Sequence, residues 1–386
     1  MAERDFDIVL LGATGFTGQL TADYLARNAP PGLRWALAGR NQKKLAAVRD
    51  HLGLPDLELL QADAGDPASL SDVAKRTRVV ITTVGPYLQY GAALVGACAE
   101  AGTDYVDLTG EPEFVDQMYL QHHETGVRTG ARLVHACGFD SVPHDLGALY
   151  TVDQLPRDVP ITLRGVVRSG GMASGGTIHS ALGQFSRARQ MKTAYAARRR
   201  AERKPADGRS SRAVSGKPHR DPVLGYWLLP LPTIDPIIVA RSGAALASYG
   251  PTFRYSHYAG TKTLRYAAGG VALVTTLAAA SQVKPVRNFL LGKVAAGDGP
   301  DEAKRDKSWF TVDFIGEGGG RTVRTRVSGG DPGYTETSMM LAEAALCLAF
   351  DDNPQTAGQV TTAQAMGENL LARVQAGGLR FETLDG

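Results

Sequence analysis

The feature that most constrains this fold is a glycine triplet, Gly12, Gly15 and Gly18, in the run GATGFTG. The triplet lies between a predicted buried strand over 5–11 and a predicted helix over 16–28. In a nucleotide-binding βαβ unit, the first glycine permits a tight turn, the second admits a pyrophosphate to the backbone, and the third lets the helix close on the strand. The start of the helix adds free N–H groups and a positive dipole for the phosphates.

The spacing of the triplet is G-x-x-G-x-x-G rather than the more familiar G-x-G-x-x-G. The prediction therefore depends on the position of the triplet between a predicted strand and a predicted helix. We predict that this loop binds the pyrophosphate of a dinucleotide; the alternative is a structural turn without a ligand. The residues predicted to bind it here are Gly12, Thr14, Gly15, Phe16, Thr17 and Gly18.

Arg40 at the end of the second predicted strand (34–40) distinguishes between dinucleotides. An acidic residue at this place would hold the ribose 2′-hydroxyl of NAD, whereas an arginine can hold the 2′-phosphate of NADP through two charge-assisted hydrogen bonds. We therefore predict NADP(H), with a solvated surface charge as the alternative for Arg40. Asp63 ends the third predicted strand (57–63). It is either a polar residue at the edge of the adenine-binding site or a turn residue.

Strand and helix patterns alternate along the first 140 residues. The predicted strands are 5–11, 34–40, 57–63, 78–86, 104–111 and 132–139. Helix ends are indicated by Asn41 as an N-cap, by Pro67 in a first turn and by Gly102 at a helix end. This alternation predicts an α/β fold with a Rossmann-type, doubly wound parallel sheet.

The pattern changes after about residue 150. We predict a strand over 161–170, a long helix over 174–199, an exposed loop over 203–221, a strand over 236–243, a hairpin over 308–329 with its turn at 316–320, and an apolar helix over 335–350. The predicted units are an NADP-binding domain (1–150), a substrate and dimerisation α+β domain (151–330), and a helical C-terminal segment (331–386) that packs on the first domain.

Composition is ordinary for a soluble enzyme, with 43% hydrophobic and 21% charged residues and a net charge of +3. The three cysteines form neither a disulfide framework nor a metal-spaced pair, which favours a reducing cytoplasm. We predict no signal peptide, because the first strand already begins at Asp5.

The apolar stretch 266–280 is shorter than the roughly 20 residues of a membrane span. It predicts a buried helix, with a lipid-facing helix or acyl-chain groove as the alternative.

Candidate catalytic residues follow the last three strands of the sheet, because ligands bind at the carboxyl ends of parallel strands. Gly85 and Pro86, which we predict to bind the cofactor, form a rigid turn before Tyr87. We predict that Tyr87 lies against the cofactor or donates its hydroxyl. The loop after the sixth strand supplies the candidates Asp140, Ser141 and His144, with helix capping as the alternative for Asp140 and Ser141. No metal site is predicted, and His122, His123 and His135 are expected to be surface or core residues.

A basic segment lies in the middle of the chain, opposed only by Glu202 and Asp207. Its cations are Arg187, Arg189, Lys192, Arg198, Arg199, Arg200, Arg203, Lys204, Arg209, Arg212, Lys217 and Arg220. The interpretations are a solvated helix face and loop, or a docking surface for an acidic acyl-carrier protein or an anionic membrane. Nucleic acid is disfavoured, because no aromatic stacking platform accompanies the cations.

The motifs GATGFTG, ALAGR, TTVGPY, YVDLTGE, CGFDSVPHDLG, SGGT and DPGYTETSMMLAEAALCLA resemble the saccharopine dehydrogenase-like family. Within that family they are most similar to trans-acting enoyl reductases of polyketide and lipid biosynthesis. The resemblance implies a Rossmann domain, a second α+β domain and a C-terminal helix that returns to the first. It also implies NADPH-dependent reduction of a carbon–carbon double bond in a carrier-bound or thioester acyl chain, with a polyketide synthase or acyl-carrier protein as partner.

Two other functions stay open at this stage. One is a saccharopine-type imine reductase or amino-acid dehydrogenase, and the other is a non-catalytic, lipid-associated NADP-binding scaffold. A homodimer and peripheral membrane contact are further options. Where relatives commonly carry serine, this chain has His144. For enoyl reduction, Tyr87 is the predicted donor or proton source, and Asp140, Ser141 and His144 are predicted to place the nicotinamide or to relay protons.

Overall fold

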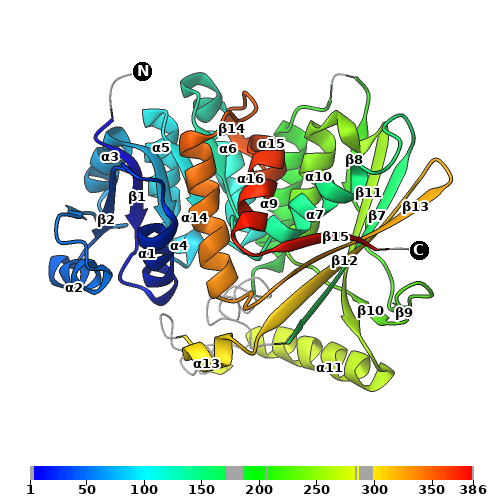
Figure 1. The fold of residues 1–386 in the computed structure, drawn as a ribbon. Helices are drawn as coiled ribbons and strands as arrows, with labels where there is room; N and C mark the ends of the chain where they lie inside the picture. Colours follow the sequence, from blue (N-terminus) through cyan, green and yellow to red (C-terminus); the bar gives the residue numbers. More distant parts are fainter. Residues whose placement is uncertain (1–3, 171–185, 206, 283–284, 287–298, 385–386) are drawn as a thin grey trace.

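The computed structural model describes residues 4–170, 186–205, 207–282, 285–286 and 299–384. Two sheets lie side by side, with helices between and around them (Figure 1). The first 134 residues build six strands of the first sheet, and the second sheet is built from residue 161 onward.

The first sheet has seven strands in the order β14-β6-β5-β4-β1-β2-β3. They are β1 (Phe6–Leu11), β2 (Trp35–Gly39), β3 (Glu58–Gln61), β4 (Thr77–Thr82), β5 (Asp104–Asp107), β6 (Arg132–Val134) and β14 (Gly358–Val360). Every neighbouring pair is parallel. β1 is buried along its whole length, as expected for a parallel strand with helices on both faces of its sheet. The predicted doubly wound parallel sheet is confirmed.

Helix ends in this half follow local side-chain chemistry. α2 (Gln42–Leu52) begins at Asn41, whose side chain accepts a hydrogen bond from the backbone N–H of Lys44. α3 (Pro67–Arg76) has Pro67 in its first turn. α5 (Ala92–Ala101) ends at Gly102, whose φ of +68° is a left-handed conformation that glycine adopts without strain. These predicted helix ends are confirmed.

Helices cover both faces of the first sheet. The others are α1 (Phe16–Asn28), α4 (Tyr87–Tyr90), α6 (Pro112–Thr129), α7 (Val142–Val152) and α14 (Thr335–Phe350). α3, α5 and α6 pack on one face, and α1, α2 and α14 pack on the other.

The second sheet is mixed, in the order β15-β13-β12-β7-β11-β10-β9, with β8 also paired to β11. Its strands are β7 (Ile161–Gly170), β8 (Ser210–Ala213), β9 (His219–Arg220), β10 (Trp227–Pro230), β11 (Thr252–Thr261), β12 (Trp309–Gly318), β13 (Arg321–Gly329) and β15 (Arg380–Leu384). β7 pairs in parallel with β11 and antiparallel with β12. The predicted strand 161–170 and the predicted hairpin over 308–329 are confirmed.

The predicted strand over 236–243 is wrong, because this segment is helix α10 (Asp235–Ala245). Pro236 occupies its first turn, and the buried Ile238, Val239 and Ser242 lie on one helical face. The run of β-branched residues had suggested a strand.

Two neighbouring predictions are revised. The predicted exposed loop over 203–221 contains the short strands β8 and β9. Of the predicted long helix over 174–199, the structure describes α9 (Ala188–Ala201). Residues 171–185, which include the SGGT motif, lie outside the described residues.

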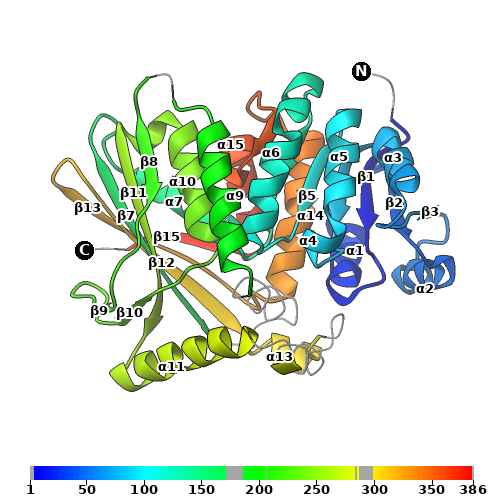
Figure 2. The same cartoon turned by 180° about the vertical axis from the view of Figure 1, so that it is seen from behind.

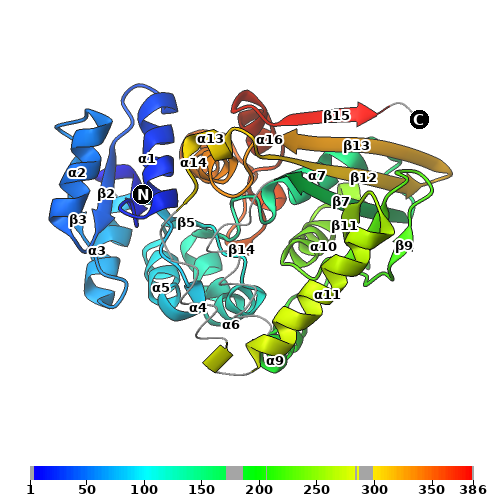
Figure 3. The same ribbon diagram turned by 90° about the horizontal axis from the view of Figure 1, so that it is seen from below.

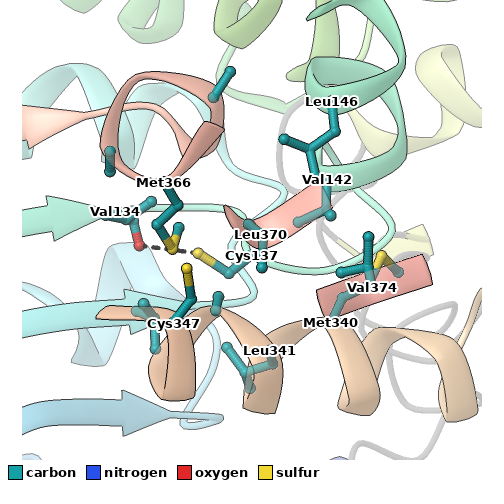
Figure 4. Packing of buried hydrophobic residues seen from close by; sticks show 14 of the residues in the cluster. Val134, Cys137, Val142, Leu146, Met340, Leu341, Cys347, Met366, Leu370 and Val374 are labelled. Carbon is teal, nitrogen blue, oxygen red and sulfur yellow. Dashed lines mark hydrogen bonds between the residues drawn. The ribbon is translucent and has the colours of Figure 1, made fainter. Parts of the chain in front are cut away.

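The C-terminal helix α14 returns to the first sheet, as predicted. It is buried over most of its length and packs on α1, β4 and α16 (Gly367–Ala376). Cys347 of α14 lies in one apolar cluster with Cys137 and Val142 of the first domain (Figure 4). The tail also adds β14 to the first sheet and β15 to the second, which the sequence did not predict.

The apolar stretch 266–280 forms most of helix α11 (Leu264–Ser281), which runs along the margin of the second sheet (Figure 3). The predicted burial is wrong for the described residues of this stretch: Tyr266 is 72% exposed, and residues 268, 269, 272, 275, 276 and 279 are exposed as well. Among the described residues, no helix combines the length and apolar character needed to cross a membrane. The remaining short helices are η1 (Ala247–Tyr249), α13 (Glu302–Arg305) and α15 (Thr362–Ala365).

Candidate active site

The glycine loop has the geometry that the triplet predicted. Gly12 has a φ of +94°, and the N–H of Gly15 donates to the carbonyl of Gly12 over 3.0 Å. A Cβ atom at Gly18 would lie 2.1 Å from the Gly12 carbonyl oxygen, so only glycine lets α1 close on β1. A Cβ at Gly15 would have its nearest neighbour at 3.5 Å, which leaves this backbone open to a ligand. The N-cap residue of α1 is Gly15, and among the described residues no side-chain hydrogen bond caps this helix.

The residues between the glycines contact the C-terminal tail. The carbonyl of Thr14 accepts from the side chain of Gln19. The Phe16 ring packs edge-on against Tyr334 with 4.9 Å between centroids. The carbonyl of Thr17 accepts a hydrogen bond from Ser338 of α14. The contacts of Phe16 and Thr17 hold the loop against the N-terminal end of α14.

At the far end of the predicted dinucleotide site, Arg40 is exposed immediately after β2. Its backbone carbonyl accepts a hydrogen bond from the side chain of Gln61, which ends β3. The Asp63 carboxylate accepts from the N–H of Gly65 over 2.9 Å, as the turn-residue interpretation predicted. Its position after β3 also fits the adenine interpretation.

The exit loops of β4 and β5 are tied together by Tyr87. Gly85 and Pro86 are exposed and Tyr87 is buried. The Tyr87 hydroxyl donates to the carbonyl of Thr82 over 3.1 Å and accepts from the N–H of Leu108 over 3.2 Å. Burial, together with the nearby Asp107 carboxylate, raises its pKa well above the ordinary tyrosine value. These contacts argue against the predicted role of Tyr87 as a proton source, because its hydroxyl is already engaged at both strand ends.

Two buried carboxylates that the sequence did not single out shape the same loops. Glu111 accepts hydrogen bonds from the N–H groups of Tyr87 and Leu88, each over 3.0 Å. Asp107 accepts from the N–H of Ala136 over 2.8 Å and contacts Nδ1 of His135 over 2.7 Å. The only signal in the sequence was their position, with Asp107 as the last residue of β5 and Glu111 in the loop that follows it.

The exit loop of β6 carries Asp140 and Ser141. Asp140 is half-buried, and a Cβ atom on Gly110 would lie 2.6 Å from its Oδ2 atom. Burial, and then the charge of Asp235, raise the pKa of Asp140 to about 7. Ser141 has a φ of +103°, and its side chain does not cap α7. Its buried hydroxyl has no hydrogen-bond partner among the described residues.

His144 lies beside two residues that the sequence did not predict, Asp235 of α10 and His257 of β11. Its Nδ1 is 3.2 Å from Oδ1 of Asp235, and Nε2 of His257 is 3.5 Å from Oδ2 of the same carboxylate. Burial lowers the pKa of both imidazoles to about 3, so both rings are neutral. Asp235 directly precedes the segment 236–243 that was predicted as a strand, and no strand was predicted over β11, so no motif pointed to either residue.

Part of the basic segment is internal. α9 packs on α6 between the two sheets (Figure 2). Arg198 is 1% exposed and forms ion pairs with Asp116 and Glu202, and Arg187 pairs with Glu113. The interpretation of Arg198 as part of a docking surface is therefore wrong, whereas Arg199 is exposed.

Residues 8–134 match the saccharopine dehydrogenase NADP-binding domain. The structure is similar to apo saccharopine dehydrogenase (L-Glu forming) from Saccharomyces cerevisiae, with a TM-score of 0.57, 12% identity, and 98% and 100% of the two chains covered. This fold and the glycine loop define an NADP-dependent oxidoreductase of the saccharopine dehydrogenase type.

Relatives of nearly full length place the chain more narrowly. A Mycobacterium tuberculosis protein, provisionally named a trans-acting enoyl reductase, is 40% identical, with 98% of each chain covered. The trans-acting enoyl reductase of Mycobacterium bovis is 35% identical, with 99% of this chain and 98% of the relative covered. The chain belongs to the family of trans-acting enoyl reductases.

Proposed function

We propose that this protein uses NADPH to reduce the carbon–carbon double bond of an acyl thioester carried by a separate polyketide synthase. The names of its full-length relatives support this reaction. Within the chain, the observation that supports this reaction is the position of two loops at the same edge of the first sheet. The loop from Gly12 to Gly18 follows β1, and Asp140 follows β6, so both lie at the carboxyl edge of one parallel sheet. That edge is where such sheets bind dinucleotides and substrates.

When bound, NADPH supplies the hydride for the β-carbon of the enoyl group. The backbone of Gly12 to Gly18 and the side chain of Arg40 would fix its two phosphate-bearing ends. Asp140 is our candidate for delivering the proton to the α-carbon, because it is the one predicted catalytic side chain in this set that is only half-buried. The unpartnered hydroxyl of Ser141 is our candidate donor to the thioester oxygen.

The test is NADPH oxidation by the purified protein with an enoyl thioester, with 2-oxoglutarate plus lysine, and with neither. We expect oxidation only with the enoyl thioester. Asp140→Asn should lower turnover by about 100-fold, which is typical for loss of a general acid, with normal NADPH affinity. Oxidation only with 2-oxoglutarate and lysine would favour the imine reductase instead.

We also propose that a carrier protein docks on the outer face of α9. Helical spacing places four exposed cations on that face: Arg189, Lys192, Arg199 and Arg200. An acidic carrier domain fits such a surface, and exposed charges of this kind act mainly on association rate.

The double variant Arg199→Glu/Arg200→Glu should lose activity on a carrier-bound substrate and keep it on a small thioester. Arg212→Glu, an exposed cation on β8, is the matched control. Equal losses on both substrates would contradict the docking surface.

A further inference from the structure

A buried cluster of three metal-ligating side chains lies where the two sheets meet. His144 comes from α7, Asp235 begins α10, and His257 lies on β11. All three side chains are almost fully buried, with 1%, 2% and 5% of their residue surfaces exposed. One ligand atom from each lies within 4.8 Å of the others.

The contacts within the cluster lack hydrogen-bond geometry. Nδ1 of His144 and Nε2 of His257 lie 3.2 and 3.5 Å from the Asp235 oxygens, yet both nitrogens and Oδ1 of Asp235 have no hydrogen-bond partner among the described residues. Buried polar atoms without partners cost about 1–3 kcal/mol each, so each calls for an explanation, and a bound ion or water would supply the missing partner. Ligand atoms about 2.0–2.1 Å from a tetrahedral ion lie roughly 3.3 Å apart, which is close to the distance from each histidine nitrogen to its nearer Asp235 oxygen, while the three ligand atoms together lie within 4.8 Å.

The charge of the cluster also favours a cation. Within the described part of the chain, no lysine or arginine forms an ion pair with Asp235. A buried carboxylate needs a positive partner or a proton, because burial removes it from water.

Neighbouring hydroxyl groups orient two of the three side chains. The Tyr255 hydroxyl lies 2.9 Å from Nδ1 of His257, the ring nitrogen that faces away from Asp235. The Thr233 hydroxyl donates to Oδ2 of Asp235. Metal-ligating histidines commonly use their second nitrogen in this way, which fixes the ring and its tautomer.

We propose that His144, Asp235 and His257 bind a divalent transition-metal ion, with Zn²⁺ as the ion whose preferred ligands they match. Two imidazoles and a carboxylate are ligands that Zn²⁺ takes in proteins, and three protein ligands leave a further position for water or another oxygen. This site differs from the sequence-based expectation of no metal, since its residues are too far apart in the chain to form a motif. The proposal does not rest on enoyl reduction.

The test is the metal content of the full-length protein after incubation with Zn²⁺ and dialysis. We expect about one ion per chain, as for a site with a complete set of protein ligands. His257→Gln and Asp235→Asn should each lower Zn²⁺ affinity by more than about 10-fold, and Tyr255→Phe by about 10- to 100-fold. His135→Gln is the matched control, because His135 is also a buried histidine beside an aspartate, and it should keep the wild-type metal content.

A second measurement uses the wild-type protein and does not depend on folding of the variants. A bound ion stabilises the folded state, so a chelator should lower the Tm of the Zn²⁺-incubated protein, and added Zn²⁺ should restore it. A metal content below about one tenth of an ion per chain, or equal Zn²⁺ affinity in wild type and in folded His257→Gln, would overturn the proposal. A Tm that is unchanged by the chelator would also overturn it.

Discussion

Gly18 approaches Gly12 so closely that a methyl group on Gly18 would lie 2.1 Å from the Gly12 carbonyl oxygen. Gly18→Ala must therefore move α1 away from β1, at a cost of about 1–3 kcal/mol typical of overpacking. The expected result is a lower Tm together with weaker NADPH binding, measured by thermal unfolding and fluorescence titration.

Gly15→Ala provides the matched comparison. Its added methyl group would meet ordinary contact distances within the protein, with the nearest atom at 3.5 Å. We expect its Tm to stay near the wild-type value while NADPH affinity falls, because the methyl group would occupy the approach of the pyrophosphate. If both variants bound NADPH as wild type does, the loop would not be the pyrophosphate site.

Arg40 should determine the preference for the phosphorylated dinucleotide. Loss of a charge-assisted contact costs about 1.5–3 kcal/mol, so Arg40→Ala should weaken NADPH binding by roughly 10- to 150-fold. NADH has no 2′-phosphate, so its affinity should change little. Titration with both cofactors, with the exposed Arg27→Ala as control, measures the difference. An equal effect on NADPH and NADH affinity would contradict a contact with the 2′-phosphate and would favour Arg40 as a solvated surface charge.

Tyr87→Phe should affect stability more than chemistry. The change removes a hydroxyl that joins Thr82 and Leu108 and leaves a backbone N–H without its partner. We expect a stability loss of about 1–3 kcal/mol in urea unfolding, with kcat within a few-fold of wild type. A loss of kcat comparable to that of Asp140→Asn, at unchanged stability, would restore Tyr87 as a proton source.

Acid should destabilise the N-terminal strand through Asp7. Burial opposes its ionisation, but hydrogen bonds and charge from Arg34, with the charge of Arg78, more than offset this and lower the pKa of Asp7. A depressed folded-state pKa means that this stabilisation is present above the unfolded-state pKa and is lost as the pH falls through the folded value. Urea unfolding at pH 7 and pH 3 should show a smaller stability difference for Asp7→Asn than for wild type; equal differences would contradict this.

The first domain was predictable because its signals are local. The glycine triplet, the cap at Asn41 and Gly102 at a helix end each lie within one βα unit, and the parallel topology follows from their alternation. The position of Arg40 could be predicted for the same reason.

The second domain depends on contacts that sequence patterns do not record. The segment 236–243 has a strand-like composition, but Pro236 and its burial against β11 make it a helix. The cluster joins His144 to Asp235 and His257, which lie 91 and 113 positions further along the chain, so it exists only after the two sheets pack. A sequence pattern also could not show that Tyr87 and Arg198 are buried with their polar groups engaged.

The central claim is tested most directly by isotope transfer from NADPH. The protein is incubated with NADPH deuterated at C4 and an enoyl thioester, and the product is examined by mass spectrometry and NMR. We predict one deuterium on the β-carbon of a saturated acyl product, with the α-hydrogen taken from solvent. An unreduced thioester, or deuterium found only on the α-carbon of an amino acid when 2-oxoglutarate and lysine are supplied, would contradict enoyl reduction.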